Sequence, residues 1–155
     1  MEDQFILDFV NLEVINTLSN LLQENKSIGR ACLTNSIFQT HMGKNHQDFT
    51  TIDKYNIIEY TQSSSFRITC EWSLWKKDYF LKYLQGNLTP WEFERQKGND
   101  NSHLIGCKNK VAIRHAEAIR RGKVNESFDF RFVNEDEELS EKVKNELNNY
   151  LKLKL

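Results

Sequence analysis

A chain of 155 residues with 39% hydrophobic residues is long enough to fold as one domain and too short for two full domains. Its 21 basic and 22 acidic residues nearly cancel, so the overall charge gives no reason to expect a nucleic acid or an anionic membrane as partner. No apolar run approaches the ~18 residues of a membrane-spanning helix, and the start of the chain lacks the basic residues of a signal peptide. We therefore expect a cytoplasmic protein without a membrane span.

The three cysteines, Cys32, Cys70 and Cys107, are odd in number, and none forms a CxxC pair. This pattern favours buried free thiols in a reducing compartment over disulfides or a zinc site.

The first third of the chain contains signals for alternating strands and helices. Residues 4–10 are typical of a short apolar strand, and Asn11 is positioned to cap an amphipathic helix that ends near Asn25. Residues 30–34 and 55–60 are typical of strands. Residues 35–53 are polar and indicate no regular element.

The densest local signals lie in residues 66–94. Alternating apolar and polar side chains predict a half-buried strand over 66–71, and a helical spacing of aromatic residues begins at Trp72. That helix is expected to end at Gly86 and Asn87.

A second helix is predicted to begin at Thr89. Thr89 is a suitable N-cap, Pro90 stands at the first helical position, and Glu92 is placed to close a capping box. Because capping occupies Glu92, the carboxylate of Glu94 is freer for chemistry.

The last third of the chain predicts a hairpin, a basic turn and a terminal helix. Residues 103–107 and 110–114 are predicted to form two short strands of a hairpin, after the turn-rich connector 97–102. Several basic residues then gather around His115 and Gly122: Arg114, Arg120, Arg121 and Lys123. Residues 135–155 carry one apolar stripe, with acids leading and lysines trailing, which predicts an amphipathic helix packed on the domain.

These elements indicate an α/β protein with a mixed sheet and flanking helices. We expect one domain over residues 1–134, followed by a C-terminal amphipathic helix over 135–155.

Several segments together resemble a family of small glycosyltransferase-like proteins of bacterial polysaccharide clusters and phages. The segments that carry the resemblance are Met1–Phe5, Arg67–Thr69, Trp75–Leu84, Thr89–Glu94, and His115 with Arg120–Lys123. The resemblance covers residues 2–123 and does not include the C-terminal helix. Members of this family are similar in fold to GT-A nucleotide-sugar transferases, so the resemblance implies a partial GT-A-like domain.

The resemblance also implies roles for particular residues. Transfer from a nucleotide sugar requires neutralisation of a departing diphosphate and a carboxylate that deprotonates the acceptor hydroxyl. Glu94 is the expected general base. The divalent metal, Mn²⁺ or Mg²⁺, is expected on Glu2, Asp3 and His115. The diphosphate is expected on Arg120, Arg121, Gly122 and Lys123. The acceptor sugar is expected near Trp72, Trp91 and Glu92.

Each of these residues also has an ordinary structural interpretation. Glu2 and Asp3 are also compatible with solvated terminal charges, and His115 with a hydrogen-bonded residue near a strand end. The basic residues are compatible with a solvated turn, and both tryptophans with core packing.

In this family a nucleotide-binding half precedes the acidic pair, and the resemblance of this sequence does not include that half. We therefore expect a glycosyltransferase-like protein that transfers a sugar from a nucleotide sugar to a saccharide acceptor and is incomplete as an isolated chain. A separate N-terminal half or a homo-oligomer is the expected partner. The alternative is a non-catalytic remnant or protein-interaction module. A nucleic-acid binder built on residues 114–123 is a weaker third hypothesis, because the overall charge is balanced.

Overall fold

The computed structural model describes residues 4–6, 9–34, 43–117, 119–120, 123–124 and 145. The chain forms two compact units: a central unit, Val10–Ile113, and a terminal unit made of Met1–Phe9 and Arg114–Leu155.

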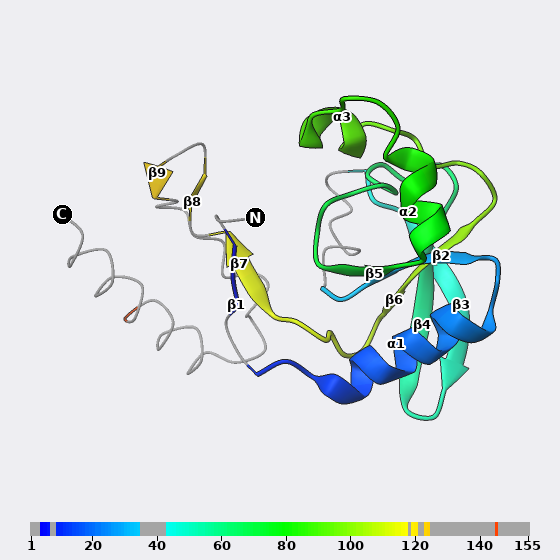
Figure 1. Ribbon diagram of the computed structural model, residues 1–155. Coiled ribbons are helices and arrows are strands. Elements are labelled where there is room, and N and C mark those ends of the chain that lie inside the picture. The colour runs from blue at the N-terminus through cyan, green and yellow to red at the C-terminus, as the bar shows by residue number, and fades with distance from the viewer. Residues whose placement is uncertain are drawn as a thin grey trace. The chain divides into compact units, whose positions relative to one another are not determined.

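The central unit is built on a five-stranded mixed sheet with flanking helices (Figure 1). Its elements in chain order are α1 (Leu12–Glu24), β2 (Ile28–Cys32), β3 (His46–Ile52), β4 (Tyr55–Tyr60), β5 (Ser73–Trp75), α2 (Lys77–Tyr83), α3 (Pro90–Glu94) and β6 (His103–Cys107). The strand order is β3-β4-β6-β2-β5, in which β2 and β6 run parallel and the other neighbours antiparallel. This architecture confirms the predicted α/β class with a mixed sheet.

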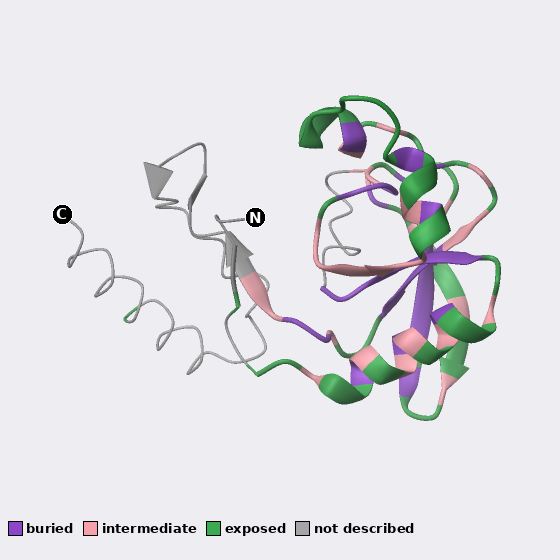
Figure 2. Cartoon of the chain, in the orientation of Figure 1, coloured by how far each residue is buried: buried purple, intermediate pink, exposed green. Residues whose placement is uncertain are grey.

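Two hydrophobic clusters cover opposite faces of this sheet. Ile57 and Ile58 are both buried neighbours in β4, and successive strand residues point to opposite faces. Ile57 belongs to the cluster that contains the α1 residues Val14, Leu18 and Leu22. Ile58 belongs to the cluster that contains Tyr79, Tyr83 and Phe93 from α2 and α3. The sheet therefore lies between α1 on one face and α2 with α3 on the other, and its middle strands are buried (Figure 2).

The helix starts predicted at Asn11 and Thr89 are confirmed. The side-chain oxygen of Asn11 accepts a hydrogen bond from the Val14 amide at 3.3 Å, and α1 ends with Asn25 as its C-cap. Thr89 and Glu92 form the complete capping box at the start of α3, with Pro90 in the first turn. These interactions span only three residues, so the local sequence is sufficient to specify them.

The predicted strand over residues 66–71 is wrong. Phe66 has a φ of 55°, in the left-handed region, and the strand that follows is β5, Ser73–Trp75. The helix begins at Lys77 and not at Trp72. The alternating pattern misleads because Arg67, expected to point to solvent, is fully buried and serves backbone groups elsewhere in the chain.

The predicted hairpin of residues 103–107 with 110–114 is also wrong. β6 forms as predicted, but it pairs with β4 on one side and with β2 on the other. A central strand has no free edge for a hairpin partner. The amides of Ala112 and Ile113 instead donate to the carbonyl oxygen of Leu33, at 3.0 and 2.9 Å.

The polar segment before residue 53 contains the strand β3, which its amino-acid composition did not predict. β3 lies at the edge of the sheet, and none of its residues is fully buried. Such a strand needs little apolar character, so its polar composition does not exclude it. The strands predicted at 30–34 and 55–60 are confirmed as β2 and β4, with β2 beginning two residues earlier.

The terminal unit contains two small antiparallel pairs. β1 (Gln4–Ile6) pairs with β7 (His115–Glu117), and β8 (Ile119–Arg120) pairs with β9 (Lys123–Val124). Except for Asn145, the predicted helix 135–155 lies outside the described residues, as does the predicted boundary after residue 134.

All three cysteines are free thiols, as predicted. Cys32 and Cys107 are buried, whereas Cys70 is exposed, contrary to the expectation of a buried thiol.

Candidate functional site

A half-open surface pocket of about 460 Å³ lies between the turn after β4 and the segment at the end of α3. One wall is formed by Gln62, Ser63, Ser64, Ser65 and Phe66, and the other by Glu94, Arg95, Gln96, Lys97 and Asn99. Its lining residues thus combine hydroxyl, amide and charged side chains with one aromatic residue, Phe66.

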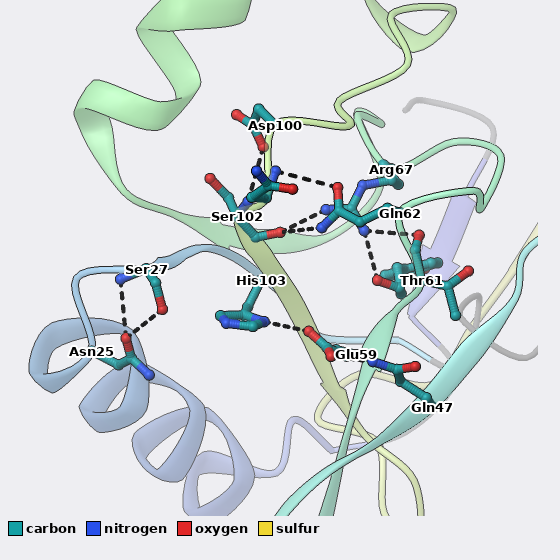
Figure 3. A network of polar contacts seen from close by, with 12 residues as sticks. Asn25, Ser27, Gln47, Glu59, Thr61, Gln62, Arg67, Asp100, Ser102 and His103 are labelled. Carbon is teal, nitrogen blue, oxygen red and sulfur yellow. Dashed lines mark hydrogen bonds and ion pairs between the residues drawn. The ribbon is translucent and has the colours of Figure 1, made fainter.

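Arg67 connects the segments that flank the two walls of this pocket. Its Nε donates to the carbonyl oxygen of Gly98 at 2.8 Å, and its Nη1 donates to those of Tyr60 and Thr61 at 2.6 and 2.9 Å. Its Nη2 donates to the carbonyl oxygen of Ser102 at 2.6 Å. One buried guanidinium thus holds the end of β4 and two residues of the connector 97–102, Gly98 and Ser102. Figure 3 shows its bonds to Thr61 and Ser102.

The wall that contains the serines is supported from behind by residues 43–45. The Ser65 amide donates to the carbonyl oxygen of Gly43 at 2.8 Å, and the Thr61 amide to that of Asn45 at 3.0 Å. Ser64 Oγ accepts from the Asn45 amide at 3.1 Å. The turn is therefore held on two sides before any ligand binds.

Glu94 is the carboxylate of the pocket. Its Oε1 accepts hydrogen bonds from Thr69 Oγ1 at 2.8 Å and from the Cys70 amide at 2.7 Å. Partial burial, and then the charge of Glu94, raise the pKa of the Cys70 thiol. Among the residues that the structure describes, none donates to Oε2 of Glu94. One oxygen is therefore fixed, and the other remains able to accept a hydrogen bond from a ligand.

A second polar network connects the sheet beside this pocket (Figure 3). Nδ1 of His103 contacts Oε2 of Glu59, and Gln47 Nε2 donates to Oε1 of Glu59 at 2.6 Å. The ring of Phe49 lies 4.9 Å from the ring of His103. These side chains come from β3, β4 and β6, so the network ties the edge strand to the centre of the sheet.

Asp100 stabilises the connector that carries the second wall. It accepts hydrogen bonds from Lys82 Nζ and, at 2.8 Å, from Tyr83 Oη, while its Oδ1 accepts from the Ser102 amide at 3.1 Å. Partial burial acts to raise the pKa of Asp100, but the bonds from Lys82, Tyr83 and Ser102 outweigh it and lower the pKa from 3.8 to about 2.

We expect Asp100→Asn to destabilise the chain in a pH-dependent way. Because the folded pKa is depressed, the carboxylate contributes stability above pH 4 that is lost as the pH falls toward 2. The loss at pH 7 is expected to be about 1 to 2 kcal/mol after allowance for solvent screening. Urea unfolding of the wild type and the variant at pH 7 and pH 2.5 measures it. An equal difference at both pH values would contradict this account.

The predicted site residues of the central unit have different surroundings. Glu94 lines the pocket, and Glu92 forms the capping box, where the backbone amide and then the hydroxyl of Thr89 lower its pKa. Trp91 is 73% exposed, and Trp72 is half-buried against the core cluster beneath α1. Neither tryptophan is among the described residues that line the pocket.

The other predicted site residues belong to the terminal unit. His115 is half-buried in β7 and pairs with Ile6, and Arg120 pairs directly with Lys123 across β8 and β9. Glu2, Asp3, Arg121 and Gly122 lie outside the described residues. The convergence of this group with Glu94 on one cleft, and the divalent metal, therefore remain predictions.

The sequence did not reveal the wall formed by residues 62–66. The alternating pattern placed Phe66 in a predicted strand over 66–71. The available signal was the run of one glutamine and three serines directly before an aromatic residue, which supplies hydrogen-bonding groups at a turn.

Comparisons with protein-family models, with curated proteins and with solved structures find no match to this chain. In the described part of the chain, every helix is too short or too polar to cross a membrane. Within the same residues, no three side chains of His, Cys, Asp or Glu gather as a metal-binding group.

Proposed function

We propose that the central unit is the acceptor-binding part of a nucleotide-sugar-dependent glycosyltransferase. The observation that carries this proposal is the position of Glu94, a carboxylate with one fixed oxygen in a pocket of hydroxyl and amide groups. A saccharide presents many hydroxyl groups, and such a lining can donate to and accept from several of them at once.

The proposed reaction uses Glu94 as the general base. The acceptor hydroxyl donates a hydrogen bond to Oε2, and its oxygen attacks the anomeric carbon of the donor sugar. As the new glycosidic bond forms, Glu94 takes the hydroxyl proton. The bond between the anomeric carbon and the diphosphate oxygen breaks, and the nucleoside diphosphate leaves with the electron pair. Thr69 and Cys70 keep the carboxylate oriented throughout, because both bind its other oxygen.

The basic residues of the terminal unit fit the leaving group in chemical character. Arg120, Arg121 and Lys123 carry the charge that a departing diphosphate requires. Their action on the same substrate as Glu94 is part of the proposal.

We expect Glu94→Gln to abolish transfer while preserving the fold. Glutamine has nearly the same shape and keeps an oxygen for Thr69 and Cys70, but it does not take up a proton. The expected loss is at least ~100-fold in the rate of nucleoside diphosphate release. The assay combines the full chain with UDP and GDP sugars, Mn²⁺ or Mg²⁺, and a panel of saccharide acceptors.

Glu13→Gln is the matched control, because Glu13 is an exposed carboxylate on α1 that contacts Lys54 and Tyr55. Release that requires both donor and acceptor, and that only Glu94→Gln abolishes, supports the proposal. Saccharide binding without any release supports the acceptor site and contradicts transferase activity of this chain alone. The absence of both release and saccharide binding contradicts the proposal and favours a non-catalytic interaction module.

A further inference from the structure

Phe66 has a backbone conformation that bulky residues rarely adopt. Its φ of 55° lies in the left-handed region, which glycine, asparagine and aspartate enter far more readily. A phenylalanine there is retained when the surrounding structure imposes the conformation, and such outliers cluster at functional sites.

The neighbours of Phe66 impose this conformation. On one side, the Ser65 amide is fixed to the carbonyl oxygen of Gly43 at 2.8 Å. On the other side, Arg67 and Ile68 are both fully buried, and Arg67 is held by the carbonyl oxygens of Gly98 and Thr61, which flank the two pocket walls. Fixed residues before and after Phe66 leave its backbone little freedom.

In this conformation Phe66 forms part of the pocket wall. Phe66 is half-buried and is the one aromatic residue among the described residues that line the pocket. Lys44 Nζ lies 5.8 Å from the centroid of its ring and forms a largely buried ion pair with Glu71 at 3.0 Å. The ring is therefore supported from the protein side by a fixed cation.

We infer that Phe66 is the stacking platform for the acceptor saccharide, an inference that rests on the proposed function. A pyranose ring has polar edges and an apolar face of C–H groups. Binding it requires hydrogen-bonding groups around an apolar, preferably aromatic, surface. The pocket lining combines both, because it includes serine, glutamine and asparagine residues together with Phe66. The acceptor sugar lies with its C–H face on Phe66 and one hydroxyl directed to Glu94.

Substitution of Phe66 by Gly, Tyr and Trp tests this inference. Glycine removes the ring and also relieves the backbone, so we expect the melting temperature of Phe66→Gly to fall by less than ~4 °C. Its affinity for saccharides is expected to fall at least ~10-fold, because the apolar contact is lost. Phe66→Tyr and Phe66→Trp keep an aromatic face and are expected to bind within ~3-fold of the wild type.

The probes are the methyl glycosides of glucose, galactose, mannose, N-acetylglucosamine and glucuronic acid, titrated into the full chain by saturation-transfer NMR. Asp53→Gly is the matched control, since Asp53 has a φ of 50° and lies outside the residues that line the pocket. It makes the same change in backbone freedom and is expected to leave saccharide affinity unchanged.

A fall in melting temperature of more than ~4 °C for Phe66→Gly would overturn the inference, because it would assign Phe66 a structural role. Unchanged saccharide affinity in Phe66→Gly would overturn it as well, while leaving the role of Glu94 intact. A wild-type chain that binds none of the probes would overturn both this inference and the acceptor site itself.

Discussion

Replacement of Arg67 by methionine is expected to lower the free energy of unfolding by about 3 to 5 kcal/mol. The substitution removes four hydrogen bonds to the carbonyl oxygens of Gly98, Tyr60, Thr61 and Ser102. Two of these acceptors keep another partner, since Thr61 also receives the Ser64 amide and Ser102 receives Gln62. The expected loss is therefore smaller than four times the cost of one unsatisfied buried group.

Urea unfolding followed by tryptophan fluorescence measures this loss. Arg95→Met is the matched control, because Arg95 is exposed at the rim of the same pocket. That variant is expected to stay within about 0.5 kcal/mol of the wild type. Equal stability of the two variants would contradict the role of Arg67 as the residue that joins the pocket walls.

The role of Arg67 explains why the sequence predicted this region wrongly. Phe66, Ile68 and Cys70 alternate with Arg67, Thr69 and Glu71, which is the pattern of a half-buried strand. The pattern assumes that charged residues face solvent. Arg67 is instead fully buried, because backbone carbonyl groups in the interior accept its hydrogen bonds. One of these acceptors, Ser102, lies 35 residues away in sequence. A short window contains no information about such partners.

Features that depend on near neighbours were predicted correctly. The Asn11 cap and the Thr89–Glu92 capping box each involve residues three positions apart. The positions of β2, β4 and β6 followed from short apolar runs. Strand order does not follow from such runs. β6 is inserted between β4 and β2, and this arrangement excludes the hairpin that residues 103–114 suggested.

The candidate site also has one part that the sequence predicts and another part that it does not. The choice of Glu94 over Glu92 followed from the capping signal, which the structure confirms for Glu92. The other wall of the pocket comes from residues 62–66, about 30 positions earlier in the sequence. Long-range bonds hold these walls in place, among them those of Arg67 to Gly98 and Thr61 and that of Gln62 to Ser102. The predicted roles of Glu2, Asp3, His115 and the basic residues 120–123 remain predictions.

Gly98→Ala is expected to destabilise the chain by about 2 to 4 kcal/mol, because it combines backbone strain with a steric clash in the core. Gly98 has a φ of 60°, and a Cβ atom there would lie 2.8 Å from Ile68 Cγ1 and 3.2 Å from Arg67 Cβ. Ile68 is fully buried, so it has no room to move aside.

Gly86→Ala, measured by the same urea unfolding, distinguishes the cost of backbone strain from the cost of the steric clash at Gly98. Gly86 has a φ of 77°, but a Cβ atom there would meet nothing within 4 Å among the described residues. Backbone strain alone is expected to cost about 1 kcal/mol at this position. The difference between the two variants therefore isolates the packing of the connector against residues 67–68. If urea unfolding gives the same loss for both, the two pocket walls are not packed tightly against each other. The pocket would then lack the rigidity that a fixed position of Glu94 requires.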